Sequence, residues 1–525
     1  MRKFIAALAV FVALTAVMPV IAFAAEEPAS KDINLELGDW RKMAKRYPMP
    51  YFAALDTPDA PAPEVLANWW NSLGDETLTR LILASLENNR DMASARSSFA
   101  EARAALGISK AALLPWLDSA GSFTNMKTGE NASLTGSQVG PIDLYKLGID
   151  ASWEIDLFGG QALKIKASAA DLQARYGALH NSWVSLSSEV ALNYISLRTL
   201  QKRLMVAEKN LGLQNATLEL LQSQYDSGLA DELALSQAKY TMEQTRSSIP
   251  PIKTGIEEAM NRLAILVGQV PGSLAEELFD YEELPDPEKI DLVGIPADFI
   301  RQRPDIYMAE RQLAAQIARK DASRKDFLPK FSLFGSIGLE SYSSAGGLSV
   351  SDGGVYSIGP KISWPIFHGG AIRKNIKVQT EKQKQALANY EQTVLNAVAE
   401  VRNALTAETQ ERLRNESLGR GVESAASAMA VAEDQYVNGL TDFNNVIIAQ
   451  RALLDLEEQL AVSEGEMLSN LVRIFKALGG GWAPMSEYGP VQARALKKDE
   501  PKGIELSDES QAYLDKIRKE LEGSD

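Results

Sequence analysis

Four stretches of the chain alternate apolar and polar residues, which is the pattern of a β-strand with one apolar and one polar face. The alternation predicts strands over residues 145–157, 330–341 and 355–367, and a weaker one over residues 116–126. A sheet built from these strands would have one face that is almost entirely apolar. In the first stretch, the apolar positions are Tyr145, Leu147, Ile149, Ala151, Trp153, Ile155 and Leu157.

The predicted strands have features of strands that cross a membrane. Their length is close to the ~9–11 residues that a tilted strand needs to span a bilayer. Tyr145, Trp153, Tyr356 and Trp364 lie near strand ends, where membrane barrels carry a girdle of aromatic side chains. A soluble β-sandwich would show the same alternation, but the flanking helical segments offer no apolar stripe large enough to cover such a sheet. We therefore favour strands in lipid.

Four strands are too few to close a barrel, because the smallest membrane barrels have about eight. An open sheet edge in lipid leaves backbone groups unpaired, at a cost of several kcal/mol for each group. Several copies of the chain must then share one barrel, and two, three or four copies would give about eight, twelve or sixteen strands. The pattern alone leaves these three choices open.

Very long helices are predicted between the strands. Residues 161–225 and 371–436 contain no proline and are rich in Ala, Leu, Gln, Lys and Ser, and a helix of that length spans roughly 100 Å. A helix over residues 75–114 and a return helix over residues 231–266 would together match one long helix. Pro250-Pro251 predicts a break or a kink in the return helix. An antiparallel coiled coil explains most of these residues, but it does not explain lipid-facing strands at one end.

The chain contains an internal duplication. Ser109 and Pro115 return as Ser323 and Pro329 at an offset of 214 residues, and Trp153 returns as Trp364 at an offset of 211. Because ordered matches at a nearly constant offset rarely arise by chance, we predict two tandem repeats. They cover residues 69–270 and 304–481 and are joined by a linker over residues 271–303 that is rich in Pro, Asp and Glu.

Two glycine turns separate each long helix from its return helix. The turns cover residues 225–231 and 436–442, with Tyr225 and Gly228 in the first and Tyr436 and Gly439 in the second. Glycine at the end of a helix is usually structural, since it adopts the left-handed conformation easily. Its presence in both repeats, at the point farthest from the strands, predicts that these turns bind a partner protein.

The start of the chain predicts export, and both flanks of the repeats are polar. Residues 1–24 have a basic start, an apolar stretch and a small-residue cleavage site, as in a secretory signal peptide; a membrane anchor would need a longer apolar run. Residues 25–68 and 482–525 are predicted to be polar periplasmic extensions. The chain has no cysteine that could carry a lipid, and its net charge of −15 argues against nucleic acid as a partner.

No catalytic or metal site is predicted. The chain has two histidines, His180 in a predicted helix and His368 beside a glycine pair, and neither lies in a metal-ligand or nucleophile pattern. The segment Lys127-Thr128-Gly129 resembles part of a hydrolase motif but stands alone in a loop. We therefore expect no enzyme activity and no cofactor.

The chain resembles the TolC-type outer-membrane factors, in particular the OprM/NodT branch that serves resistance-nodulation-division (RND) efflux pumps. The resemblance covers about residues 68–482. The motifs that carry it are Trp69-Trp70-Asn-Ser-Leu-Gly-Asp75, Asn88-Asn89-Arg-Asp91, Gly294-Ile-Pro296-Ala-Asp298, Arg303-Pro304-Asp305-Ile306, the two Leu-Pro sites and the paired Tyr-x-x-Gly turns.

The resemblance implies a mixed α and β membrane protein that forms a homotrimer. Each chain would add four strands to a twelve-stranded β-barrel in the outer membrane, and its helices would build an α-helical barrel in the periplasm. The two turns would meet a periplasmic adaptor that bridges to an inner-membrane RND transporter. Several relatives have an acidic residue in a closing ring where this chain has Ile448, so we expect any gate to use Asp442, Asn444 and Asn445.

The function implied is that of an exit channel that conducts small molecules out of the cell. The runner-up within the channel class is the exit duct of a type I protein secretion system, which the fold cannot separate from an efflux channel. A trimeric adhesin would need exposed repetitive heads, whereas the loops that join the predicted strands are short. The transported substrate cannot be read from the sequence.

Overall fold

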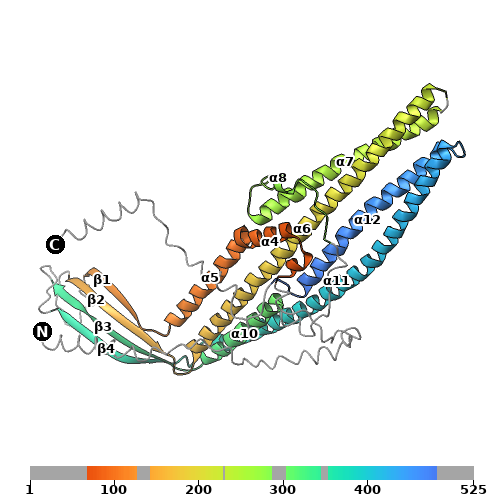
Figure 1. The fold of residues 1–525 in the computed structure, drawn as a ribbon. Coiled ribbons are helices and arrows are strands. Elements are labelled where there is room, and N and C mark those ends of the chain that lie inside the picture. The colour runs from red at the N-terminus through yellow and green to blue at the C-terminus, as the bar shows by residue number, and fades with distance from the viewer. Residues whose placement is uncertain (1–67, 127–141, 229–230, 286–302, 344–352, 482–525) are drawn as a thin grey trace, which may run out of the picture. The chain divides into compact units, whose positions relative to one another are not determined.

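The computed structural model describes residues 68–126, 142–228, 231–285, 303–343 and 353–481, which are mostly helical with one small sheet (Figure 1). Both halves of the chain contain a helix, two strands, a helix of 67 residues and a shorter return helix, in that order. The elements are η3 (Trp69–Leu73), α4 (Glu76–Asn88), α5 (Arg90–Ala111), β1 (Trp116–Met126), β2 (Ile142–Ile155), α6 (Gly160–Asp226), α7 (Glu232–Val267), α8 (Ala275–Leu278), α10 (Pro304–Lys325), β3 (Lys330–Ser343), β4 (Gly354–Ser363), α11 (Ala371–Val437) and α12 (Phe443–Ala477).

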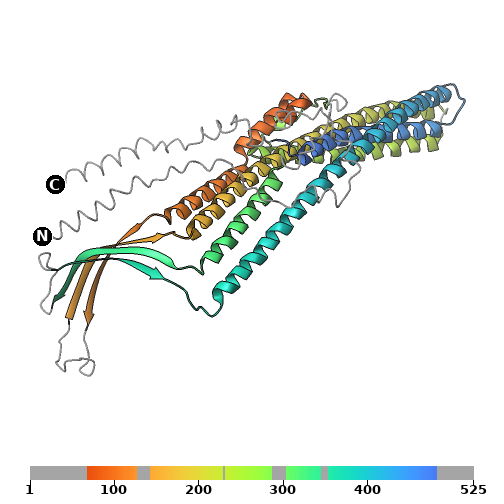
Figure 2. The ribbon, with the colours of Figure 1, turned by 90° about the horizontal axis from the view of Figure 1, so that it is seen from below.

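The four strands form one antiparallel sheet in the order β1-β2-β3-β4. β2 and β3 each have a neighbour on both sides, whereas β1 and β4 are the edge strands among the described residues. The strands continue into helices that pack in the matching order, α5 on α6, α6 on α10 and α10 on α11 (Figure 2). One edge of the sheet and helix layer is therefore formed by β1 and α5, and the other edge by β4 and α11.

The main hydrophobic core lies where α4 and η3 pack on the middle of α6 and on the ends of α7 and α12. Trp69 of η3 is fully buried and stacks on Phe475 of α12, with their ring centroids 5.3 Å apart. Large aromatic side chains contribute most to such cores because each removes 150–250 Å² of surface from water. A second cluster joins the far ends of α6, α7, α11 and α12 through residues such as Leu221, Leu235 and Phe443.

The predicted helix over residues 75–114 is wrong at one point, because Asn89 divides it into α4 and α5. The backbone of Asn89 is extended, with φ −61° and ψ 137°, and its side-chain oxygen accepts hydrogen bonds from the N–H groups of Asp91 and Met92. Its amide group donates to the carbonyl of Leu266 on α7, at 2.9 Å. Asn89 therefore ends one helix, caps the next and fastens both to the end of α7.

The predicted break at Pro250-Pro251 does not occur, since α7 continues through both residues. Proline removes a helical hydrogen bond and clashes with the preceding turn, so the helix needs support from outside. Ile249 and Ile252 flank the two prolines and are buried with Ala207 of α6 in one apolar cluster. Packing against α6 thus outweighs the local preference of the proline pair.

Strand ends differ modestly from the predicted ranges. β1 covers residues 116–126 as predicted, and β2 begins three residues earlier than expected, at Ile142, because it pairs there with Met126. β4 ends at Ser363 instead of residue 367, because its neighbour β3 begins at Lys330, which is paired with Ser363. The predicted signal peptide, all but residue 68 of the N-terminal extension, the whole extension over residues 482–525 and Lys127-Thr128-Gly129 lie outside the described residues.

Within the described ranges, none of the helices is both long enough and apolar enough to cross a membrane.

Candidate functional site: the exposed sheet face and the helix tips

The register of the sheet gathers the apolar positions of all four strands on one face. Ile149 of β2 lies opposite Ile337 of β3, which in turn lies opposite Tyr356 of β4. Because directly opposed residues point to the same side, the strands add to each other's apolar surface. The face carries Leu117, Phe123, Tyr145, Leu147, Ile149, Trp153, Ile155, Phe331, Leu333, Ile337, Leu339, Tyr356, Ile358 and Ile362.

This apolar face is exposed in the single chain. Leu117, Ile358 and Ile362 each expose more than half of their side-chain surface, at 58%, 57% and 64%. A contiguous apolar surface of this kind marks a site of contact with a membrane or a partner.

The opposite face of the sheet is polar and contains two ion pairs between β2 and β3. Lys146 lies 3.2 Å from Glu340, and Lys330 lies 3.7 Å from Glu154. Asp118 and Asp150 are directly opposed on the same face. Asp143, at the loop end of β2, is the one charged residue of the described strands that lies on the apolar face; the other charged residues lie on the polar face.

The four aromatic residues predicted for a girdle lie at the two ends of the apolar face. Tyr145 packs on Phe123, with ring centroids 4.9 Å apart, and Tyr356 lies at the same end of the sheet. Trp153 and Trp364 lie at the helix end. Each indole N–H donates to a backbone carbonyl at the start of the neighbouring elbow, Trp153 to Leu113 at 2.8 Å and Trp364 to Phe327 at 3.0 Å.

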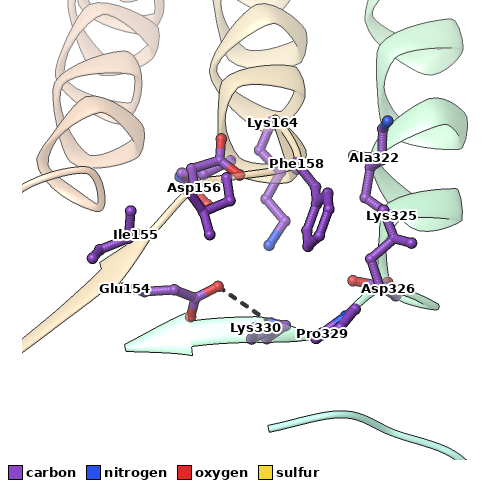
Figure 3. A pocket seen from close by; sticks show the side chains of 14 residues that line it. Glu154, Ile155, Asp156, Phe158, Lys164, Ala322, Lys325, Asp326, Pro329 and Lys330 are labelled. Carbon is purple, nitrogen blue, oxygen red and sulfur yellow. Dashed lines mark ion pairs between the residues drawn. The ribbon is translucent and has the colours of Figure 1, made fainter. Parts of the chain in front are cut away.

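A small pocket lies at the elbow where β2 turns into α6, next to the end of α10 and the start of β3 (Figure 3). Its charged lining residues are the acids Glu154, Asp156 and Asp326 and the bases Lys164, Lys325 and Lys330. Asp156 accepts a hydrogen bond from the N–H of Ala162 and thereby supports the start of α6. With equal numbers of acids and bases, the pocket shows no preference for an anion or a cation.

At the far end of the helices, the two glycine turns have the same backbone conformation. Gly228 and Gly439 have φ angles of 72° and 70°, in the left-handed region that favours glycine. Their surroundings differ. Tyr225 is exposed, whereas Tyr436 donates a hydrogen bond from Oη to Gln224 of the other turn at 2.8 Å and packs edge-on against Phe443. Burial and the negative charge of Asp231 raise the pKa of Tyr436.

The residues predicted for a gate lie at the start of α12. Asp442, Asn444 and Asn445 are exposed, and the carboxylate of Asp442 caps no backbone N–H. Its counterpart in the first repeat, Asp231, does cap its helix, through the N–H of Ala234 at 2.8 Å. Asn445 donates to Thr441 Oγ1 at 2.7 Å.

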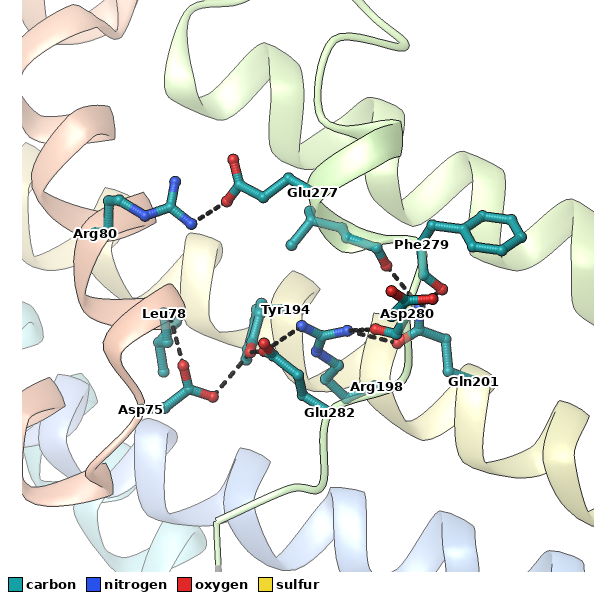
Figure 4. Close-up of polar contacts among 11 residues, drawn as sticks. Asp75, Leu78, Arg80, Tyr194, Arg198, Gln201, Glu277, Phe279, Asp280 and Glu282 are labelled. Carbon is teal, nitrogen blue, oxygen red and sulfur yellow. Dashed lines mark hydrogen bonds and ion pairs between the residues drawn. The ribbon is translucent and has the colours of Figure 1, made fainter.

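A buried polar network that was not predicted from the sequence fastens the linker to α6 (Figure 4). Arg198 is 1% exposed and donates to Glu282 Oε2 at 2.5 Å, to the carbonyl of Asp280 at 2.6 Å and to Gln201 Oε1 at 2.9 Å. Tyr194 donates to Asp75, the cap of α4, at 2.8 Å. Burial and the nearby Asp75 raise the pKa of Tyr194, which keeps the phenol protonated.

A second buried arginine holds α10 to α11 and α12. Arg303 binds Asp305 through two hydrogen bonds, Glu400 at 2.7 Å and the carbonyl of Ala477 at 2.7 Å. Burial alone would lower the pKa of Arg303, but its bonds to Asp305 and Glu400 raise it. These arginine contacts stabilise the framework of helices.

His180 is a buried residue of the helical core. His180 is buried between Tyr176 and Trp183, with ring centroids 4.3 and 4.7 Å away, and burial lowers its pKa to about 4. The imidazole is therefore neutral at physiological pH. Over the described ranges, no group of three or more His, Asp or Glu side chains could hold a metal ion.

Comparison with known proteins agrees with this architecture. The outer membrane efflux protein family matches residues 81–269 and 295–480, more than half of the chain. The solvent efflux pump outer membrane protein SrpC of Pseudomonas putida is 30% identical over 78% of this chain and 86% of its own length. Nodulation protein T of Rhizobium leguminosarum bv. trifolii is 28% identical over 80% of this chain and 89% of its own length.

The solved structures lead to the same family. The outer-membrane channel OprN superposes with a TM-score of 0.76 at 33% identity, over 82% of this chain and 94% of OprN. The chain belongs to the outer membrane efflux protein family.

Proposed function

We propose that this protein is the outer-membrane exit channel of a tripartite RND-type efflux system and conducts small molecules out of the cell. One observation supports this most strongly. The sheet presents a broad apolar face, while its charged residues other than Asp143 at the loop end of β2, such as Lys146 and Glu340, lie on the other face. An outer face in lipid and an inner face toward water would account for both.

Three copies would close the structure. β1 and β4 are open edges, and unpaired backbone groups in lipid cost several kcal/mol each, so neighbouring copies must pair there. A homotrimer would have about twelve strands, within the range of known membrane barrels. α6 and α11, with 67 residues each, would extend roughly 100 Å into the periplasm.

The relatives favour efflux over type I secretion. Among them are a solvent efflux pump protein, a toluene efflux pump protein and a cation efflux system protein. The substrates in these names differ widely, which supports a wide passage whose selectivity is set by its partners. We therefore assign this chain to efflux without naming its substrate.

The helix tips would dock a periplasmic adaptor. Tyr225, Gly228 and Gly439 are exposed on adjacent turns, and Tyr436 would hold the two turns together through Gln224. Asp442, Asn444 and Asn445 would line the narrow end as a polar gate. Asp442→Ala and Asn445→Ala channels should leak more in planar bilayers, and unchanged closed-state conductance would count against both residues.

The proposed function is tested by deleting the gene and measuring the minimum inhibitory concentrations of a panel of antibiotics, solvents and metal ions. The deletion should sensitise cells to at least one compound, and wild-type protein on a plasmid should restore resistance. A genomic neighbour of the ABC-transporter type, together with loss of a secreted protein and no change in sensitivity, would instead support secretion.

A further inference from the structure

Basic side chains gather where the helices meet the sheet. α5 and α10 end there, and α6 and α11 begin there (Figures 1 and 2). Lys110 lies in the last turn of α5, and its counterpart Arg324 lies in the last turn of α10. Lys166 and its counterpart Lys377 lie within the first two turns of α6 and α11. In a chain with a net charge of −15, such a gathering of positive charge calls for a local cause.

Helix dipoles account for only part of this charge. The C-terminal end of a helix is partly negative, so Lys110 and Arg324 stabilise the ends of α5 and α10. The N-terminal end is partly positive and favours acidic residues. α11 has no acidic residue in its first turn, and its first two turns contain Arg373, Lys374 and Lys377. Because positive charge at a helix start costs stability, its presence there indicates a role in binding a negatively charged group.

The basic residues at the helix starts have no counter-charge within the described part of the chain. Lys166, Arg373 and Lys377 are exposed, and none of the three forms an ion pair with a carboxylate of the described residues. Farther along α11, by contrast, Lys384 pairs with Glu381 at 3.1 Å. Exposed charges of one sign without a counter-charge attract a ligand of the opposite sign.

These residues lie on the side of the helices that continues the apolar face of the sheet. Lys164 lines the elbow pocket together with Glu154, which belongs to the polar face (Figure 3). Lys166 follows Lys164 by two residues, about 200° around the helix, and therefore points to the opposite side of α6. Arg373 and Lys377 are four residues apart and share one side of α11. By the duplication, this side of α11 is equivalent to the side of α6 that carries Lys166.

Resting on the channel proposed above, we propose that a basic belt at the elbow binds the phosphate groups of anionic phospholipids in the inner leaflet of the outer membrane. The apolar face would lie among the acyl chains, and Trp153 and Trp364 at its helix end would lie at the interface. The lipid headgroups would then be level with the starts of α6 and α11, within reach of long basic side chains. The belt consists of Lys110, Lys166, Arg324, Arg373 and Lys377.

Tryptophan quenching by brominated lipids tests the belt in the whole channel, reconstituted in bilayers. Bromine on the acyl chains quenches tryptophans at the lipid-facing side of the sheet, such as Trp153 and Trp364. Comparing brominated phosphatidylglycerol with brominated phosphatidylcholine gives the preference of the protein for an anionic lipid. Since one basic residue near the membrane contributes about fivefold to such binding, Arg373→Gln/Lys377→Gln should lower this preference at least about fivefold. Salt at about 0.5 M should lower the preference of the wild-type protein as well, because it screens exposed charges.

The matched control is Lys164→Gln/Lys382→Gln, which removes the same charge from α6 and α11 on the opposite side. Lys382 is the counterpart of Asp171, which shares one side of α6 with Lys164 at a spacing of seven residues. This control should keep the lipid preference of the wild-type protein. Equal loss in both variants, or no loss in either, would overturn the belt and leave the channel proposal standing.

A competition experiment separates a lipid headgroup from a soluble anion. Inorganic phosphate, added at matched ionic strength, should not displace brominated phosphatidylglycerol from the wild-type protein, because the lipid is also held by its acyl chains. Displacement would identify a soluble anion as the ligand and would overturn the lipid belt. If neither brominated lipid quenched the wild-type protein at all, the sheet would not lie in lipid, and the channel proposal would fail together with the belt.

Discussion

Replacing Ile149 by lysine should sharply weaken folding into membranes. Ile149 lies near the middle of β2, a strand of 14 residues, and on the apolar face of the sheet, where it is 47% exposed. A lysine on the lipid face of a membrane barrel costs about 2–4 kcal/mol at the middle of the bilayer. We expect a loss of about 3 kcal/mol for each chain, which is roughly a hundredfold in its folding equilibrium.

The neighbouring residue is a matched control. Asp150→Lys introduces a lysine at the adjacent position, on the polar face of the sheet. It also removes the repulsion between Asp150 and Asp118, which are directly opposed. It should change stability by no more than about 0.5 kcal/mol. Urea titration of protein folded in lipid vesicles, followed by tryptophan fluorescence, measures both variants. Equal losses for Ile149→Lys and Asp150→Lys, or a larger loss for Asp150→Lys, would refute the assignment of the lipid face.

Three further substitutions test other parts of the molecule. Arg303→Met should lower the free energy of unfolding in urea by about 2–3 kcal/mol, because it leaves Asp305 and the carbonyl of Ala477 without their hydrogen-bond donor, while the half-exposed Glu400 contributes little. A loss below about 1 kcal/mol would contradict this. Burial lowers the pKa of His180 to about 4, below its value of about 6.5 in the unfolded chain. The wild-type protein should therefore lose stability as the pH falls from about 6.5 toward 4, by about 3 kcal/mol at most, because the unfolded chain takes up the proton first. His180→Phe should abolish this pH dependence. An unchanged pH profile in the variant would exclude His180 as the cause. Gly439→Ala should strain the tip turn by about 1 kcal/mol and impair efflux, whereas Gly419→Ala, in open space within α11, should do neither; equal resistance in both strains would argue against a role of the turn.

The sequence predicted the elements of the fold well where local pattern decides them. The alternation around Ile149 identifies a strand with one apolar face, and long stretches without proline identify α6 and α11. The sequence could not predict where packing overrides local preference. Asn89 interrupts a helix because Leu266 accepts its amide hydrogen, and Pro250-Pro251 stays helical because its neighbours pack on α6.

Residues that act through distant contacts were also missed. Arg198 resembles any other arginine in a long helix, and its buried site exists only because Glu282, 84 positions away, crosses α6. Trp153 was predicted to lie at the lipid interface, but its hydrogen bond to Leu113 depends on the elbow between α5 and β1. The glycine turns were found because they recur in both repeats, whereas the inward position of Tyr436 required the structure.

The most direct test of the account is the mass of the purified protein in detergent. Light scattering that separates the detergent contribution should give three chains in each particle, and removal of detergent should cause aggregation, because the apolar face and both strand edges need lipid or a neighbouring copy. A stable monomer that remains dissolved without detergent would contradict the lipid-facing sheet and the shared channel.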